Sequence, residues 1–168
     1  EANEVFDTKG TDAYRDYQLA RLDTPLARGV AFPFIRRLLR LNELYSKQQP
    51  IEVVVLSRSS ADAGQRFFRS CKYYGLGISR GAFLSGQSPY PYIGAFNASI
   101  FLSAHREDVV SAVRAGFPAG LVFPSTATED DPDHELRIAF DFDGVLADDT
   151  SEKVYKENKN LELFHQHE

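Results

Sequence analysis

The feature that most constrains the fold of this chain is a repeated change in the spacing of its apolar residues. Short runs rich in Val, Ile, Leu and Phe, such as residues 51–57 (IEVVVLS) and 98–104 (ASIFLSA), alternate with segments whose apolar residues recur every three to four positions. The short runs are typical of buried strands, and the segments between them are typical of helices. Their alternation is the pattern of βαβ units. We therefore predict an α/β fold, with a doubly wound, mainly parallel, Rossmann-like sheet and helices on both of its faces.

Each element is predicted from its local pattern. Helices are expected over residues 1 to about 20 with a break at Gly10, from Phe32 to before Pro50, and over residues 60–77 and 105–117, with a Pro-interrupted helical turn at 88–97. Strands are expected at 51–57, 81–86, 98–104, 119–125 and 136–142. The helix that starts at Phe32 is expected to bury a broad apolar face, and Ser60 is expected to be the N-cap of the helix after it.

The composition is that of a compact soluble domain. The chain has 168 residues, of which 43% are hydrophobic and 26% are charged, and its net charge of −5 is unfavourable for binding nucleic acid. The single cysteine, Cys71, excludes an intramolecular disulfide and fits a reducing compartment. No apolar stretch approaches the ~20 residues that cross a bilayer, so we expect a cytoplasmic protein with no membrane partner.

The chain contains no methionine, and both of its ends lie within polar, amphipathic sequence. We therefore expect it to be a segment of a longer polypeptide. Three parts are predicted: an N-terminal helical, cap-like segment at 1–30, an α/β core at 31–147, and the start of a second cap-like helical segment at 148–168.

Two carboxylates, Asp141 and Asp143, end the last apolar run, in IAFDFDGVL. Ligands of parallel sheets bind beyond the carboxyl ends of the strands, where these carboxylates and Ser57 are expected. Mg²⁺ binds one or two carboxylates together with waters and phosphate oxygens, and one Asp could attack phosphorus while the other protonates the leaving oxygen. Ser57, with Arg58 and Ser59 beside it, would bind the phosphoryl oxygens. The alternative is an Asp-Gly turn after a strand, but the longer pattern favours phosphoryl chemistry.

The segment IAFDFDGVLADDTSE matches the first motif of the haloacid-dehalogenase-like (HAD-like) phosphohydrolases. Together with PFIRRLLRLN, VVLSRSSADAGQRFFRS and YYGLGISRGAFLSGQSPYPYIGAFNASIFLSA, it makes the chain resemble the type I cytosolic 5′-nucleotidase family over nearly its whole length. The resemblance implies a HAD-like fold and Mg²⁺-dependent hydrolysis of nucleoside 5′-monophosphates through an aspartyl-phosphate. Asp141 would then be the nucleophile and Asp143 the general acid and base, and both would bind Mg²⁺.

The chain departs from the pattern of this superfamily, which requires a lysine and an acidic pair after the first motif. Only 25 residues follow Asp143. In the upstream half, residues 85–96 contain no lysine, and Ser103 and Ala104 stand where carboxylates are expected.

One interpretation is that the upstream half is a degenerate copy of the enzyme core. Circular permutation would then place the strand at 136–142 in the centre of the sheet, between 51–57 and 98–103, and bring the two carboxylates to Ser57. Impaired activity, a non-catalytic phosphate- or nucleotide-binding module and a structural domain are left open as alternatives. Formation of a homo-oligomer, or pairing with the missing half of the chain, is also left open.

A few other residues are candidates for binding a ligand. Tyr90 and Tyr92 are candidates for stacking on a nucleotide base. His165, His167 and Glu168 have spacing suited to a transition metal, but a truncated chain end is the favoured interpretation.

Overall fold

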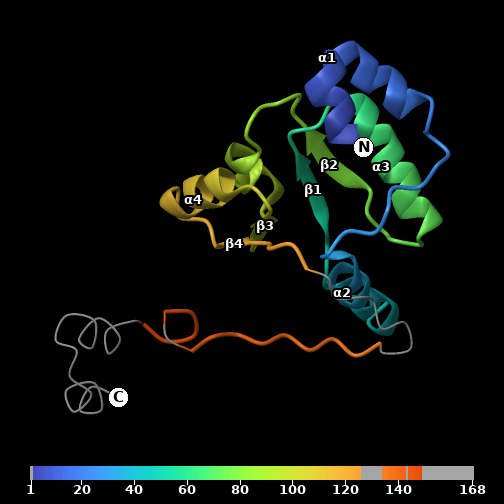
Figure 1. The fold of residues 1–168 in the computed structure, drawn as a ribbon. Helices are drawn as coiled ribbons and strands as arrows, with labels where there is room; N and C mark the ends of the chain where they lie inside the picture. The colour runs from blue at the N-terminus through green and yellow to red at the C-terminus, as the bar shows by residue number, and fades with distance from the viewer. Residues whose placement is uncertain (1, 126–133, 143, 149–168) are drawn as a thin grey trace. The chain divides into compact units, whose positions relative to one another are not determined.

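The computed structural model describes residues 2–125, 134–142 and 144–148, and the chain divides into two units, Glu1–His134 and Glu135–Glu168. The elements of the first unit are α1 (Ala2–Leu19), α2 (Phe32–Leu44), β1 (Val54–Ser57), α3 (Ala61–Tyr73), β2 (Arg80–Phe83), the 3₁₀ turns η1 (Tyr90–Tyr92) and η2 (Gly94–Phe96), β3 (Phe101–Ser103), α4 (Arg106–Arg114) and β4 (Ala119–Leu121), as Figure 1 shows. Their order is the one predicted from the sequence, and it confirms the α/β class. The sequence-based division at 30/31 and 147/148 stays a prediction.

Helix α1 bends at Gly10, as the sequence predicts. Gly10 has φ 80° and ψ −173°, a region open almost only to glycine, so the helix cannot run straight through it. The helix packs against α3. Near its end, the buried Gln18 accepts a hydrogen bond from Arg66 of α3 (Nη1 to Oε1, 3.2 Å), and Arg66 Nε donates to the carbonyl oxygen of Thr24 (2.9 Å). These bonds hold the end of α1 and the following connector against α3.

The broad buried face predicted for the helix at Phe32 is wrong. Helix α2 begins there with Pro33 in its first turn, as predicted, but none of its residues is fully buried. A helix buries its apolar face only where another element covers it, and within the described residues no helix or strand packs extensively against α2. Its end is held by Asn42, whose Nδ2 donates to the carbonyl oxygen of Ile51 (2.6 Å) and whose Oδ1 accepts from the Ile51 N–H (2.9 Å).

The strands of the first unit pair in parallel, as predicted. β1 pairs with β2, from Val54 opposite Arg80 to Ser57 opposite Phe83, and β3 pairs with β4 in the same sense. Each pair is connected by a helix, α3 or α4, so each is a βαβ unit. Helix α3 packs on β2 through its own aromatic side chains, with the ring of Phe68 5.8 Å from that of Phe83.

A single doubly wound sheet is not seen, because the described strands form two two-stranded sheets. The strand predicted at 136–142 is absent from the structure, since residues 134–142 contain no helix or strand. A strand requires a neighbouring strand that pairs with its backbone N–H and C=O groups. The described remainder of the second unit, 144–148, consists of a turn and an isolated bridge residue and offers no such neighbour. The doubly wound order with 136–142 at its centre stays a prediction.

The core of the first unit joins its two sheets. Ile93, Phe101 and Ala112 are buried together, and Leu56 of β1 packs against them. The remaining side chains that pack on this cluster are Tyr90, Ala98, Phe117 and Ala119. The segment around η1 and η2 is therefore part of the core, because it supplies Ile93.

Candidate functional site

The two strands of the first sheet end on the same side, and the loops that follow them run together. Residues 57–59 accept three backbone hydrogen bonds from 84–86: Leu84 N to Ser57 O (2.9 Å), Ser85 N to Ser59 O (3.1 Å) and Gly86 N to Arg58 O (2.6 Å). Ser85 and Gly86 both have positive φ values, 48° and 97°. The predicted phosphate-binding residues therefore lie on a backbone that the neighbouring loop holds in place.

Ser57 is the last residue of β1 and is half-buried. Its Oγ accepts a hydrogen bond from the N–H of Ser59 (3.1 Å). A serine hydroxyl has one proton to donate besides its acceptor sites. Accepting the Ser59 N–H thus orients the hydroxyl without using its proton, and that proton remains available to an oxygen ligand.

Helix α3 begins directly after these residues. Ser60 is its N-cap residue, as predicted, but its side chain makes no capping hydrogen bond, and its buried Oγ has no partner within the described part of the chain. The first N–H groups of a helix lack partners inside the helix, and their partial positive charge favours an anion. Asp62 in the first turn opposes such an anion, although Arg15 lies 3.9 Å from its carboxylate.

Arg58 turns its side chain toward α4. Its Nε donates to Asp108 Oδ2 (2.9 Å) and its Nη2 donates to Asp108 Oδ1 (2.6 Å), which is a bidentate ion pair. Asp108 is 1% exposed, and its Oδ1 also accepts a hydrogen bond from Ser88 Oγ. A buried carboxylate on α4 therefore joins the end of β1 to the loop after β2.

The charges of this pair stabilise each other. The hydrogen bonds from Arg58, with a smaller contribution from Ser88, lower the pKa of Asp108 although burial opposes the shift. The hydrogen bond to Asp108 raises the pKa of Arg58. Both groups are therefore charged at neutral pH, and the hydrogen bonds from Arg58 offset the cost of burying the charged Asp108 carboxylate.

Asp141 lies in the second unit, where its side chain is exposed and its Oδ1 accepts the N–H of Phe142 (2.9 Å). The carbonyl oxygen of Phe142 accepts the N–H groups of three following residues, and Gly144 has φ 71°, so the chain turns sharply after the motif. Asp143 lies outside the described residues. Within the described ranges, no group of three or more His, Cys, Asp or Glu residues is arranged to hold a metal.

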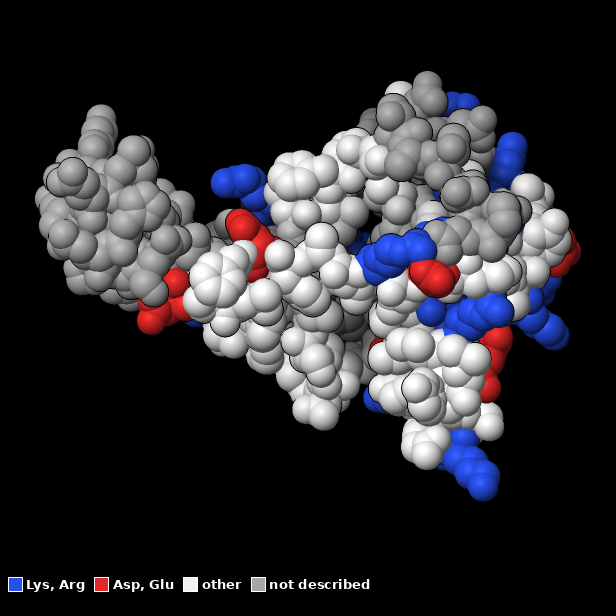
Figure 2. All heavy atoms as spheres, turned by 90° about the horizontal axis from the view of Figure 1, so that it is seen from below, with Lys and Arg blue, Asp and Glu red and all other residues white. Residues whose placement is uncertain are grey.

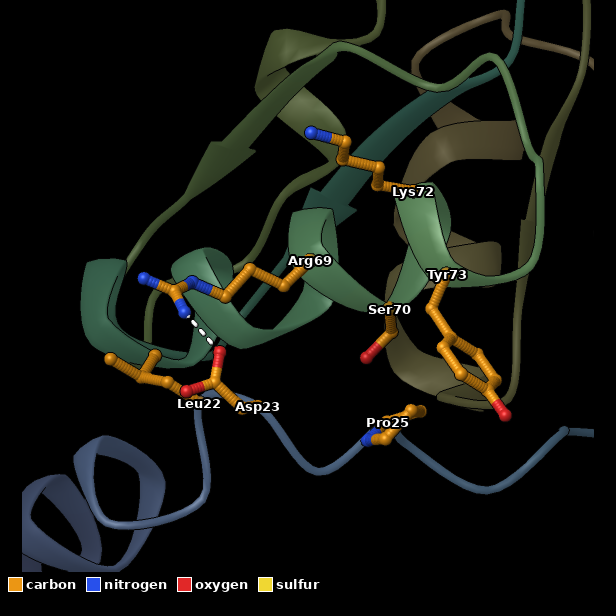
Figure 3. Close-up of a pocket in the computed structure, with 7 residues that line it drawn as sticks. All are labelled: Leu22, Asp23, Pro25, Arg69, Ser70, Lys72 and Tyr73. Carbon is orange, nitrogen blue, oxygen red and sulfur yellow. Dashed lines mark hydrogen bonds and ion pairs between the residues drawn. The ribbon is translucent and has the colours of Figure 1, made fainter.

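Two clefts formed by described residues of the first unit are lined by residues other than Ser57, Arg58 and Ser59. The first, of about 420 Å³, lies between the connector after α1 and the outer side of α3. Figure 3 shows that Arg69 reaches across it to Asp23, while Lys72 points away from this ion pair. Because Asp23 already neutralises Arg69, the residues that line this cleft do not indicate a ligand.

The second cleft, of about 480 Å³, lies between α2 and the end of α3, and Arg36, Arg37 and Arg40 line it. Its opposite wall is formed by the end of α3 and the residues up to Gly77. The last carbonyl groups of a helix carry partial negative charge. The three arginines line the same cleft as this helix end, beside which positive side chains are favoured.

Positive and negative side chains are interspersed on the face of the molecule that Figure 2 shows. On the face seen in Figure 2, Lys and Arg side chains lie in separate groups, several of them next to Asp or Glu. The ion pairs include Arg80 with Glu52 at 2.9 Å. A face of this kind lacks the continuous basic tract typical of nucleic-acid binders. None of the helices within the described ranges combines the length and apolar character of a membrane-spanning segment.

The whole chain matches a known protein family. A family model described as 5′-nucleotidase matches residues 1–168. The chain belongs to the 5′-nucleotidase family. It is similar to cytosolic 5′-nucleotidase 1B from Homo sapiens, with 31% identity over 173 residues that cover 100% of this chain and 28% of the relative. It therefore spans less than a third of the length of that curated relative. No solved structure matches the chain.

Membership of the 5′-nucleotidase family confirms the resemblance drawn from the sequence. Of the predicted site residues, the structure brings Ser57, Arg58 and Ser59 together in one loop. Asp141 belongs to the other unit and Asp143 lies outside the described residues, so their approach to this loop stays a prediction.

Sequence reasoning missed Asp108 and Ser88. Asp108 lies in the first turn of α4, where the helix dipole favours an acid whatever else it contacts, so its position gives no signal of a partner. Its pairing with Arg58 joins residues 50 positions apart, and no local motif indicates it. Of the aromatic candidates, Tyr90 packs against the core cluster, whereas Tyr92 is 38% exposed.

Proposed function

We propose that this chain forms part of a Mg²⁺-dependent 5′-nucleotidase that hydrolyses nucleoside 5′-monophosphates to nucleoside and phosphate. The observation that carries the proposal is the match of all 168 residues to the 5′-nucleotidase family. The Asp-Phe-Asp-Gly-Val-Leu pattern at 141–146 supports it, because two carboxylates separated by one residue suit metal-assisted phosphoryl transfer. A cytoplasmic location is part of the proposal, since the relative is described as cytosolic.

In the proposed reaction, Asp141 is the nucleophile. An oxygen of its carboxylate forms a bond to phosphorus as the bond between phosphorus and O5′ of the nucleoside breaks, and Asp143 gives its proton to O5′. In the second step, Asp143 takes a proton from water, the water oxygen bonds to phosphorus, and the aspartyl-phosphate bond breaks to release phosphate. Each carboxylate therefore returns to its starting state.

The carboxylate of Asp141 suits a hard divalent cation. It is exposed, and its described hydrogen bond is a single backbone N–H. Asp141 and Asp143 would hold Mg²⁺, which when bound supplies positive charge that offsets the phosphate charge.

The substrate phosphate is proposed to lie at the loop after β1. The hydroxyl proton of Ser57 and the N–H groups at the start of α3 would donate to its oxygens, with Arg58 and Ser59 beside them.

A second candidate is a phosphate- or nucleotide-binding module without turnover. It is favoured by the absence of lysine from residues 85–96 and by Ser103 and Ala104 at the end of β3, where the superfamily pattern has carboxylates. Such a module would bind the same nucleotide and leave it intact.

The two candidates are separated by measuring phosphate release from AMP with and without Mg²⁺. For the enzyme, release requires Mg²⁺ and falls by about 10³-fold or more in Asp141→Asn. The matched control is Asp23→Asn, at an exposed carboxylate in the first cleft, which should keep its activity. Calorimetric binding of AMP without release supports the second candidate, and the absence of both binding and release rejects both.

A further inference from the structure

The ion pair between Arg58 and Asp108 uses only part of the arginine. A guanidinium has five N–H donors, and the pair takes one from Nε and one from Nη2. Nη1 makes only a long contact, 3.5 Å, to the carbonyl oxygen of Gly86. The Arg58 side chain is 34% exposed, whereas that of Asp108 is 2% exposed. The edge of the guanidinium formed by Nε and Nη2, its inner edge, is therefore occupied by Asp108. The other edge, formed by Nη1 and the second N–H of Nη2, is its outer edge and remains able to bind an anion.

The pair also restricts where that outer edge can lie. Asp108 is held on α4 and accepts a hydrogen bond from Ser88, so its carboxylate has a defined position. The Arg58 backbone is held by the Gly86 N–H (2.6 Å). An arginine fixed at both ends loses little further freedom when it binds an oxygen ligand, and preorganisation of this kind increases affinity.

We propose that Asp108 and Ser88 are positioning residues that hold Arg58 so that its outer edge binds the substrate phosphate next to the Ser57 hydroxyl. The inference rests on the proposed function, because it adds residues to the same phosphate site. Neither residue touches the phosphate. Both act through Arg58.

The competing explanation is that the pair only fastens α4 to the end of β1. The two explanations predict opposite changes in the affinity of Asp108→Asn for phosphate. Asp108→Asn removes a negative charge close to the site, so Coulomb attraction alone predicts tighter binding of phosphate. A positioning role predicts weaker binding, because the amide has one acceptor oxygen where the carboxylate has two, and its NH₂ group would face an arginine donor.

The test is the dissociation constant of inorganic phosphate, measured by calorimetry on the whole chain. We expect Asp108→Asn and Arg58→Lys each to weaken phosphate binding roughly tenfold, the effect of losing a hydrogen bond to a charged group. The matched control is Arg80→Lys, which alters an arginine paired with Glu52 at the opposite end of the same two strands and should leave the affinity unchanged.

A melting curve is recorded for every variant so that loss of folding is recognised. Should Asp108→Asn fail to fold, Ser88→Ala replaces it, since it removes only the hydroxyl that contacts the carboxylate. Where AMP turnover is measured, we expect variants that lose the positioning of Arg58 to have a higher KM and a kcat within about twofold of the wild type.

Ser57→Ala separates this inference from the proposed function. If Ser57→Ala weakens phosphate binding while the variants at Arg58, Asp108 and Ser88 lower only the melting temperature, the positioning role is rejected and the phosphate site stands. Tighter binding by Asp108→Asn also rejects it. If Ser57→Ala leaves the affinity unchanged, the phosphate site itself is rejected, and the inference fails with it.

Discussion

Gly64 of α3 lies against the ring of Phe83 in β2. A Cβ added at Gly64 would lie 2.8 Å from the ring Cδ2 and 2.9 Å from Cε2, closer than carbon atoms pack. We expect Gly64→Ala to lower the free energy of unfolding by about 1–3 kcal/mol, the usual result of overpacking. Urea unfolding measures it. Gly77→Ala is the control, because no atom lies within 4 Å of its added Cβ, and a loss of stability there as large as at Gly64 would contradict the steric explanation.

The buried Asp108 carboxylate makes stability depend on pH. Its pKa is lower in the folded chain than in the unfolded chain, chiefly because Arg58 donates to it. A depressed pKa gives stability that is present above the unfolded value of about 3.9 and lost as the pH falls through the folded value. We therefore expect the stability of the wild type to fall as the pH decreases below about 4.

Asp108→Asn removes this titration. The advantage of the wild type over Asp108→Asn should be constant from neutral pH down to the unfolded pKa and should shrink below it. Urea unfolding at a series of pH values measures both proteins. A difference that stays constant down to the most acidic pH would show that Arg58 does not lower the pKa of Asp108.

Among the elements, α1 depends on α3 for its position. Arg66 is 7% exposed and bonds to Gln18 and the Thr24 carbonyl, whereas Arg69, one turn later, makes a surface pair with Asp23. Arg66→Met would leave the buried side-chain oxygen of Gln18 without this donor and would also remove the bond to the Thr24 carbonyl oxygen, at a cost of about 1–3 kcal/mol. Arg69→Met should cost about 1 kcal/mol or less.

Amide hydrogen exchange locates the effect of Arg66→Met. We expect faster exchange in α1 and the connector after it, with exchange in β1 and β2 unchanged, because the lost bonds join α1 to α3. Equal acceleration in α1 and in the strands would mean that α1 and the sheet open together.

The order of elements could be predicted from the sequence, since each has its own period and end signals, such as Pro33 at the start of α2 and Gly10 in α1. Their extent could not. The run at 51–57 forms a strand only from Val54, because β2 pairs with it only from there. Helix α2 is less buried than its sequence predicts. An apolar helix face shows only that another element could pack on it, not that one does.

For the whole molecule, the sequence predicted the loop that carries Ser57, Arg58 and Ser59, because a serine at the end of a buried run is a local signal. The pairing of Asp108 with Arg58 could not be predicted, because a contact between residues 50 positions apart produces no local sequence pattern. The local sequence also does not determine whether residues 136–142 complete one sheet, because strand formation depends on the neighbouring strands as much as on the strand's own residues.

Leu56 of β1 packs into the cluster formed by Ile93, Phe101 and Ala112, although no backbone ladder joins the two sheets. Water would reach this shared cluster if either βαβ unit came apart alone. The two should consequently melt in one cooperative transition, and neither should survive as an independent fragment after a cut between β2 and β3.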